Sequence, residues 1–300
     1  MSDDLPLAVA VATYKRPDGL RRLMQSLAVQ EGVRAHVTHI VVDNDPEGSA
    51  RPVVDGAQLQ GVVYVVEPQP GIAAARNRCL DEAARRRCAA IAFIDDDEVA
   101  SVRWLASLER TAEASGAEIV SGPVHVDLPP GTAWWIRRLG VFERPQHREG
   151  GRVRWPATNN CLVSRVAIDR LDVRMFDEDF SATGGSDADL MARLRAAGAT
   201  TAWAEGAVVT ELVPPERTHF RWIWRRGVRL GNVSARLLMR QRSRASVFAI
   251  GLVRIARGLV LLPVAFLWRR RSAGPLALEV PKGVGVVAAS VGALVKEYRR

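Results

Sequence analysis

Cysteine is scarce in this chain, and the few cysteines present are not spaced to form a structural framework. Only Cys79, Cys88 and Cys161 occur among the 300 residues, and none belongs to a CxxC pair. This count excludes a disulfide-stabilised fold and a zinc ribbon, and it fits a reducing compartment. The N-terminal segment also lacks the basic start and the cleavage site of a signal peptide, so we expect a cytoplasmic chain.

Several common active-site motifs are missing as well. The first apolar run is followed by TYKRPDG where a dinucleotide-binding fold would have GxGxxG, and no GxxxxGK(S/T) is present. HExxH, GxSxG and a Cys/His pairing are also absent. These absences argue against a dinucleotide-dependent oxidoreductase, a P-loop NTPase and a nucleophilic hydrolase. The composition, 48% apolar and 25% charged, is that of a globular protein.

Acidic residues are nearly missing from the C-terminal part of the chain. Residues 217–300 contain 18 Lys and Arg against two acidic residues, Glu279 and Glu297, which gives this segment a net charge of +16. The other 216 residues contain 24 basic and 31 acidic side chains, a net charge of −7. This asymmetry predicts a polyanionic partner for the basic tail, either nucleic acid or an anionic membrane surface.

Strand-like and helix-like patterns alternate through the first two thirds of the chain. The expected strands are Leu7–Tyr14, Val37–Asp43, Val62–Val66, Ala89–Ile94, Glu118–Val126 and Thr201–Leu212. The expected helices are Arg16–Gln30, Arg76–Arg87, Val102–Ser115 and Gly184–Gly198. Strands separated by helices predict an α/β fold with a mainly parallel central sheet and flanking helices, which binds ligands beyond the carboxyl ends of its strands. Residues 127–183 predict loops and short strands.

A run of acidic residues follows the expected strand Ala89–Ile94 directly. It consists of Asp95, Asp96, Asp97 and Glu98. Carboxylates gathered at a strand end repel one another unless a cation neutralises them, and such hard oxygen ligands select Mg²⁺ or Mn²⁺. A solvated turn or a helix N-terminus would explain the same residues without a metal. Asp43 closes a second expected strand, which favours the functional interpretation because two strand ends then offer acids to one cleft.

Five segments in a fixed order resemble the family 2 inverting glycosyltransferases, which have the GT-A fold. They are VATYKRP, IVVDND, PGIAAARN, FIDDDE and GGSDADL. The resemblance covers roughly residues 5–215, and several ordered motifs are far more specific than one. It implies a GT-A nucleotide-diphospho-sugar transferase domain over residues 1–216. Within it we expect a nucleotide-sugar half at 1–126 and an acceptor half at 127–216, with a basic helical region at 217–300.

The resemblance also implies which residues hold the donor. It places Thr13, Tyr14, Arg16 and Asp43 around the base and ribose, and Arg76 near the diphosphate. FIDDDE corresponds to the Asp-x-Asp motif of the family, which makes Asp95 and Asp97 the metal ligands and brings Asp95 and Asp96 to the donor. Because three aspartates are consecutive, Asp96 remains an alternative ligand.

The second signature of the family, Gly-Glu-Asp-x-Asp-Leu, is present as GSDADL at residues 185–190, with Ser186 in place of the glutamate. The resemblance makes Asp187 the catalytic base. An acceptor hydroxyl must lose its proton as it attacks the anomeric carbon, and a positioned carboxylate can accept that proton. Capping of a helix is the alternative role for Asp187 and Asp189. A turn is the favoured interpretation of Asn159 and Asn160.

The basic tail contains one apolar stretch long enough to cross a bilayer, Ala245–Leu267. Arg254 and Arg257 share a helix face near its middle, where each costs about 2.5–3.5 kcal/mol in a span, so a helix lying on the membrane surface is expected. Arginines at 240, 242, 244, 269, 270 and 271 flank the stretch and would meet anionic headgroups. We therefore expect a protein peripheral on the inner face of the cell membrane, with no nucleic acid partner. A single span and a tail packed on its own domain are the alternatives.

The sequence therefore predicts inverting transfer of a single sugar from a nucleotide-diphosphate sugar, with UDP as the expected nucleotide. The acceptor would be a hydroxyl of a saccharide or of a polyprenyl-linked saccharide. The Gln-x-x-Arg-Trp of processive relatives is incomplete, because Thr218 stands where the glutamine would be, three residues before Arg221. One alternative is a GT-A-like nucleotidyltransferase, although its glycine- and lysine-rich N-terminal loop is absent. Another is a non-enzymatic basic protein, against which Asp95, Asp97 and Asp187 argue.

Overall fold

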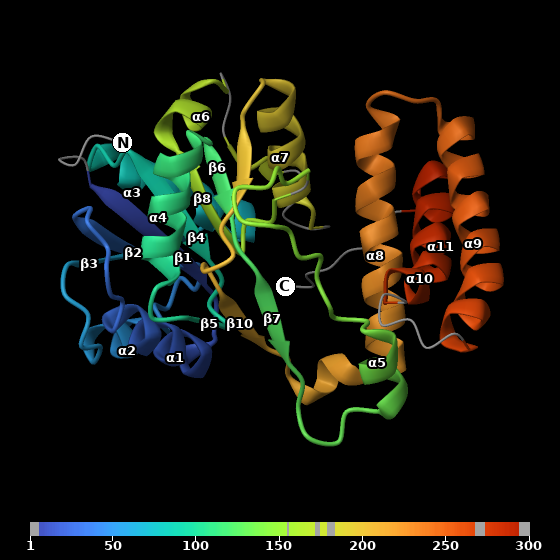
Figure 1. The fold of residues 1–300 in the computed structure, drawn as a ribbon, viewed down its shortest axis with the longest axis horizontal. Coiled ribbons are helices and arrows are strands. Elements are labelled where there is room, and N and C mark those ends of the chain that lie inside the picture. Colours follow the sequence, from blue (N-terminus) through green and yellow to red (C-terminus); the bar gives the residue numbers. More distant parts are fainter. Residues whose placement is uncertain (1–5, 155, 172–174, 179–183, 268–273, 294–300) are drawn as a thin grey trace. The chain divides into compact units, whose positions relative to one another are not determined.

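A central sheet dominates the N-terminal part of the molecule (Figure 1). The computed structural model describes residues 6–154, 156–171, 175–178, 184–267 and 274–293. Within them the main sheet has the strand order β3-β2-β1-β4-β8-β6-β9. Its strands are β1 (Leu7–Thr13), β2 (Val37–Asp43), β3 (Val62–Val66), β4 (Ala90–Ile94), β6 (Ile119–Ser121), β8 (Asn160–Ser164) and β9 (Thr201–Trp203). Strands β1 to β4 are parallel to one another, and β8 is antiparallel to both β4 and β6.

Helices cover both faces of this sheet because the side chains of β1 alternate between two apolar clusters. Leu7, Val9 and Val11 belong to a cluster with α1 (Pro17–Ala28) and α4 (Trp104–Ser115). Ala8 and Ala10 belong to a second cluster with α3 (Ile72–Arg85) and α7 (Ser186–Ala196). Both clusters are buried, as the near-continuous apolar run of β1 predicts for a parallel sheet. Two short helices, α2 (Arg51–Asp55) and α6 (Arg165–Asp169), complete this part of the fold.

Two expected strands are each divided between two sheets, which corrects the prediction. Residues 118–126 form β6 and then β7 (Val124–Asp127), because Pro123 cannot donate to the ladder. Residues 201–212 form β9 and then β10 (Val209–Leu212). A second sheet joins β5 (Glu98–Ala100), β10 and β7 in that order. Gly122 makes the bend possible, because a Cβ there would lie 2.1 Å from the carbonyl oxygen of Ala207.

Contacts divide the chain into two compact units. The first comprises Met1–His125, Arg144–Ser181 and Ser186–Glu211, and the second comprises Val126–Glu143, Ala182–Gly185 and Leu212–Arg300. The second unit therefore takes in residues 126–143, which include α5 (Trp134–Leu139) and which no sequence pattern assigned to the tail. The functional division at residues 126 and 216 stays a prediction.

The second unit is built from helices. After a 3-10 turn, Pro215–Thr218, it contains α8 (Phe220–Met239), α9 (Arg244–Leu267), α10 (Gly274–Ala277) and α11 (Glu279–Ser290). Helix α11 packs against both α8 and α9. Glycines allow these helices to approach backbone to backbone, since a Cβ at Gly231 or at Gly285 would lie 1.9 Å from a carbonyl oxygen of the neighbouring helix.

Helix α9 leaves a broad apolar surface uncovered within its unit. Its exposed apolar side chains are Phe248, Leu252, Val253, Leu259, Val260, Leu261 and Val264. By length and composition its Arg244–Val264 segment could cross a membrane, with a mean hydropathy of 2.0. Arginines 269–271, which were expected to flank it, lie outside the described residues.

Candidate active site

The acidic run predicted at a strand end lies at the carboxyl ends of β1 and β4, inside the first unit. Thr13 closes β1, and its hydroxyl donates to Asp96 at 2.8 Å. Arg16 begins the next segment and donates to Asp96 at 3.0 Å and to Asp97 at 3.1 Å. The two strands are paired in parallel, so their ends meet at one edge of the sheet and bring these residues together.

Arg76 of α3 joins the acidic run to the predicted catalytic base. Its guanidinium is buried, and it forms ion pairs with Asp95, at 2.7 Å, and with Asp187 of α7. The ring of Phe176 lies under this guanidinium, with its centroid 5.6 Å from the central carbon. Burial acts to lower the pKa of Arg76, but the two carboxylates outweigh it and raise that pKa. A permanently charged arginine thus connects Asp95 with Asp187.

Negative charge exceeds positive charge at this edge of the sheet. The four carboxyl groups of Asp95, Asp96, Asp97 and Asp187 meet the two guanidinium groups of Arg16 and Arg76. Burial raises the pKa of Asp96 to about 6, although Arg16 opposes the shift. Burial also raises the pKa of Asp95, where Arg76 opposes and the charges of Asp97 and Asp187 add to the effect. The site resists holding all of its carboxylates ionised without a further cation.

The carboxylate oxygens at this edge of the sheet could supply some of the ligands of a hard divalent cation. No group of three or more His, Cys, Asp and Glu side chains within the described residues has the arrangement of a complete metal site. Mg²⁺ and Mn²⁺, however, are commonly bound by one or two carboxylates, with substrate phosphates completing the coordination. Asp95 and Asp97 supply oxygens of that kind, and their side chains remain 39% and 20% exposed. The excess of carboxylate charge fits such an ion better than it fits a solvated turn.

Asp187 is accessible, whereas Asp189 is not. Asp187 lies in the first turn of α7, and its side chain remains 41% exposed. Asp189 is fully buried and accepts a hydrogen bond from Arg193 on the same helix at 2.8 Å. The structure therefore leaves Asp187 able to meet a substrate and gives Asp189 a helix-stabilising role.

The residues predicted around the nucleoside have different surroundings. Tyr14 is 38% exposed, next to Lys15. Asp43 is fully buried, and it accepts hydrogen bonds from the backbone of Asp45 at 3.0 Å, the backbone of Ala50 at 2.7 Å and the hydroxyl of Tyr64 at 2.9 Å. Asp43 thus orders the loop after β2, and its contact with a nucleoside stays a prediction.

Of two buried hydrogen-bonded side chains near the site, Asn44 escaped the sequence analysis and Glu98 was named there only as part of the acidic run. Asn44 donates to the carbonyl oxygens of Glu67 and Gln69 and accepts from the backbone of Gly71, so it fixes the turn that leads into α3 and Arg76. Glu98 is 1% exposed and accepts from the backbone of Asp95 at 3.2 Å, which holds the acidic run in place. The signal available in the sequence was a polar side chain directly after an apolar strand.

The predicted turn at Asn159 and Asn160 has a structural role. Asn159 donates to Glu98 at 2.6 Å, and Asn160, the first residue of β8, accepts from the indole of Trp104 at 2.8 Å. Both asparagines are buried, so the structure supports the interpretation that did not involve an acceptor. Their amides connect β8 with the acidic run and with α4.

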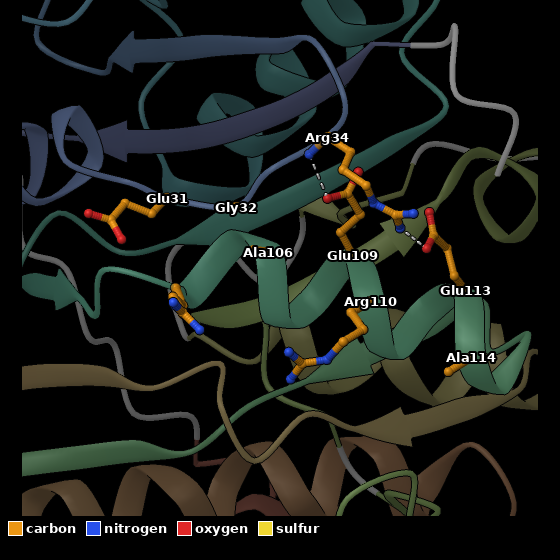
Figure 2. Close-up of a pocket in the computed structure, with 9 residues that line it drawn as sticks. Glu31, Gly32, Arg34, Ala106, Glu109, Arg110, Glu113 and Ala114 are labelled. Carbon is orange, nitrogen blue, oxygen red and sulfur yellow. Dashed lines mark hydrogen bonds and ion pairs between the residues drawn. The ribbon is translucent and has the colours of Figure 1, made fainter.

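A surface hollow of about 650 Å³ lies along α4 and shares no lining residue with the candidate site (Figure 2). Glu109 in its wall accepts hydrogen bonds from the backbone of Arg34 and of Ala35, both at 3.0 Å. Arg34 also forms an ion pair with Glu113. These contacts hold the segment before β2 against α4, which explains the charged lining without a ligand.

Comparison with known proteins shows what this arrangement is similar to. The profile of a family described as "Glycosyltransferase like family 2" matches residues 5–229. The succinoglycan biosynthesis protein ExoM of Rhizobium meliloti (strain 1021) is 35% identical over 240 residues, which cover 79% of this chain and 76% of that protein. Residues 1–349 of S. aureus TarS in complex with UDP match with a TM-score of 0.56 and 15% identity over 93% of this chain and 90% of that one. Another TarS structure matches with a TM-score of 0.54 and 14% identity over 94% and 54%.

Proposed function

The chain belongs to the family 2-like glycosyltransferases, with the GT-A fold expected from its motifs, and on that premise we propose that it transfers one sugar from a UDP-sugar to a saccharide hydroxyl with inversion. ExoM is a succinoglycan biosynthesis protein, which supports a role in the assembly of a bacterial surface polysaccharide. We propose a polyprenyl-linked saccharide as the acceptor. Family membership argues against a nucleotidyltransferase and against a non-enzymatic basic protein.

The connection of Asp187 to Asp95 through Arg76 is the observation that carries this proposal. It brings an accessible carboxylate on α7 next to the acidic run that would receive the donor diphosphate. Asp187 would accept the proton of the acceptor hydroxyl as that hydroxyl attacks the anomeric carbon. One base and one displacement invert the configuration at that carbon.

The donor end of the site uses residues of opposite charge. Arg76 would attract and orient the diphosphate, because a guanidinium group binds phosphate oxygens in pairs, and Arg16 would lie near the base and ribose. Asp95 and Asp97 would hold Mg²⁺ or Mn²⁺, with Asp96 as the alternative ligand. When bound, that ion supplies a Lewis acid that balances the charge of the departing nucleoside diphosphate.

We also propose that the second unit associates with the cytoplasmic face of the cell membrane. The exposed apolar side chains of α9 and the basic residues around it, such as Arg240, Arg242 and Arg244, support this location. Arg257 is exposed among those apolar side chains, so the helix would lie on the surface with its basic groups at the headgroups.

The test of sugar transfer compares Asp187→Asn with Asp55→Asn. Asp55 is an exposed carboxylate paired with Arg51 in α2, so its loss should leave activity unchanged. Asp187→Asn should still bind UDP but should lose about 10²–10⁴-fold in turnover with UDP-sugar and saccharide acceptor, because an amide cannot accept the proton. Near-normal turnover of Asp187→Asn at saturating substrates would contradict the assignment of the base.

A further inference from the structure

Residues 175–178 carry an aromatic ring that supports Arg76 from the apolar side of the first unit. Phe176 is fully buried, and its ring meets that of Phe93 on β4 edge-on, with the ring centroids 5.7 Å apart. The guanidinium of Arg76 lies over the same Phe176 ring, 5.6 Å from its centroid. Phe176 therefore lies between the apolar cluster under α3 and α7 and the arginine that connects the two carboxylates of the candidate site.

Two helices hold the backbone of this segment. The side-chain amide of Asn77 on α3 donates to the carbonyl oxygen of Phe176 at 2.8 Å and accepts from the N–H of the same residue at 2.9 Å. Arg193 of α7 donates to the carbonyl oxygen of Met175, and Asp189 accepts from the same guanidinium at 2.8 Å. Because one buried amide satisfies both backbone groups of Phe176, this residue is fixed relative to α3.

The position of the Arg76 guanidinium determines two contacts at once. One terminal nitrogen donates to Asp187 and the other donates to Asp95, so a rotation of the group would break both hydrogen bonds together. An aromatic ring attracts a cation most strongly where water is excluded, and Arg76 is buried. The ring also fills the space beside the guanidinium, which a smaller aliphatic side chain would leave open.

We propose that Phe176 is a positioning residue for sugar transfer, and that Asn77 keeps its ring beneath Arg76. The ring holds the two ends of the guanidinium on Asp95 and Asp187, so that the base and the diphosphate site stay in register. Phe176 itself contacts no substrate and acts through Arg76. This inference rests on the roles that the proposed function gives to Arg76 and Asp187.

The test compares Phe176→Leu with Phe93→Leu. Both substitutions remove a buried ring from the same apolar cluster and lose the same ring-to-ring contact, so both should lower the melting temperature. With UDP-sugar and a saccharide acceptor, Phe176→Leu should raise the KM for the UDP-sugar about fivefold and lower kcat about tenfold, because Arg76 is displaced. Phe93→Leu should leave that KM within about twofold, since a loss of folded enzyme lowers the apparent kcat alone. An unchanged KM in Phe176→Leu, or an equal increase in both variants, would overturn the positioning role.

A variant of Asn77 tests how the ring is held. Asn77→Ala keeps the ring but removes both hydrogen bonds to its backbone. It should raise the KM for the UDP-sugar as Phe176→Leu does, and the two substitutions together should raise it no further, because both act through the same contact with Arg76. Increases that multiply in the double variant would show that Asn77 does not act through the ring.

A second measurement needs no substrate. Arg76→Lys keeps the positive charge but removes the planar group, and urea unfolding compares it with Phe176→Leu and with the double variant. The unfolding constant of the double variant should rise about fivefold less than the product of the two single increases, because the singles lose the same contact. Increases that simply multiply would overturn the contact and the proposal with it. Coupling in a protein that transfers no sugar would instead overturn the proposed function and leave the support of Arg76 by Phe176 in place.

Discussion

The two charged regions of this molecule have opposite imbalances. In the first unit, four carboxyl groups meet Arg16 and Arg76 at one edge of the sheet. In the second unit, burial and the positive charges of Arg254 and Arg226 lower the pKa of Lys282, and the charge of Glu279 opposes this shift. Each region places like charges near one another where solvent is partly excluded. The comparison teaches that carboxyl groups dominate one region and basic groups the other, and under the proposed function the acidic region would take a cation together with a diphosphate.

Removing the central arginine of the acidic region should have the largest effect on stability. Arg76→Met leaves Asp95 and Asp187 without their shared partner, and we expect it to lower the free energy of unfolding by about 3 kcal/mol. The expected loss is at the low end of the range for breaking a buried ion pair, because the side chains of Asp95 and Asp187 remain about two-fifths exposed. Urea unfolding measures the change. Lys282→Met in the basic region should not lower the free energy of unfolding. Replacement of a basic residue by methionine should therefore destabilise the protein in the acidic region only.

Arg165→Met is the control for Arg76→Met. Arg165 forms an exposed ion pair with Asp169 within α6, and such pairs contribute about 0–1 kcal/mol. Equal destabilisation by the two substitutions would mean that Arg76 is no more than a surface pair, and the contrast between the regions would fail.

A divalent cation should stabilise the acidic region and leave the basic region unchanged. UDP with Mn²⁺ at about 100 times the dissociation constant should add about 2.7 kcal/mol to the stability of the first unit. Asp97→Ala should lose the part that depends on Mn²⁺, because the ion loses a carboxylate ligand. Thermal unfolding with UDP in Mn²⁺ or in EDTA measures this. Equal stabilisation by UDP in both conditions would contradict the metal role of Asp97.

A fall in pH should lower the free energy of unfolding of the first unit, because His39 of its main sheet is buried. Burial lowers the pKa of His39 on β2 to about 4, against 6.5 in the unfolded chain. The unfolded chain therefore binds the proton first, and stability is lost as the pH falls from 6.5 towards 4, by about 2 kcal/mol at pH 5. His39→Gln should remove this loss, measured by urea unfolding at pH 7.5 and pH 5. An unchanged pH dependence in that variant would assign the loss to other groups.

The sequence predicted the elements with strong periodicity and missed the contacts between distant residues. The bounds of β2 and β3 agree with their predicted ranges, because apolar runs between turns leave no alternative. Helix α3 begins at Ile72, one turn before the predicted Arg76, because Gly71 takes a positive φ that ends the preceding loop. Pro123 is a local signal for the division of Glu118–Val126 between two sheets, but the bend also depends on how Gly122 packs against Ala207, a residue distant in the sequence.

The same distinction holds for the candidate site. Motif resemblance named Asp95 and Asp187, and the structure brings them together, but their connection joins Arg76 to a residue 111 positions later in the chain. The asparagine contacts of Asn44 and Asn159 were equally out of reach, because a single polar residue has no period. Asp43 shows the opposite case, since its motif was evident while its hydrogen bonds to the loop after β2 were not.

The glycine contacts between α8, α9 and α11 have a calorimetric consequence. Where a Cβ at Gly231 or Gly285 would collide with a neighbouring carbonyl, the helices exclude water mainly from peptide groups, and several apolar side chains of α9 are exposed already in the folded state. Exposure of apolar surface raises the heat capacity on unfolding, and exposure of polar surface lowers it. The heat-capacity increment per residue of the helical unit should therefore be small, and its stability should vary less steeply with temperature than that of the sheet.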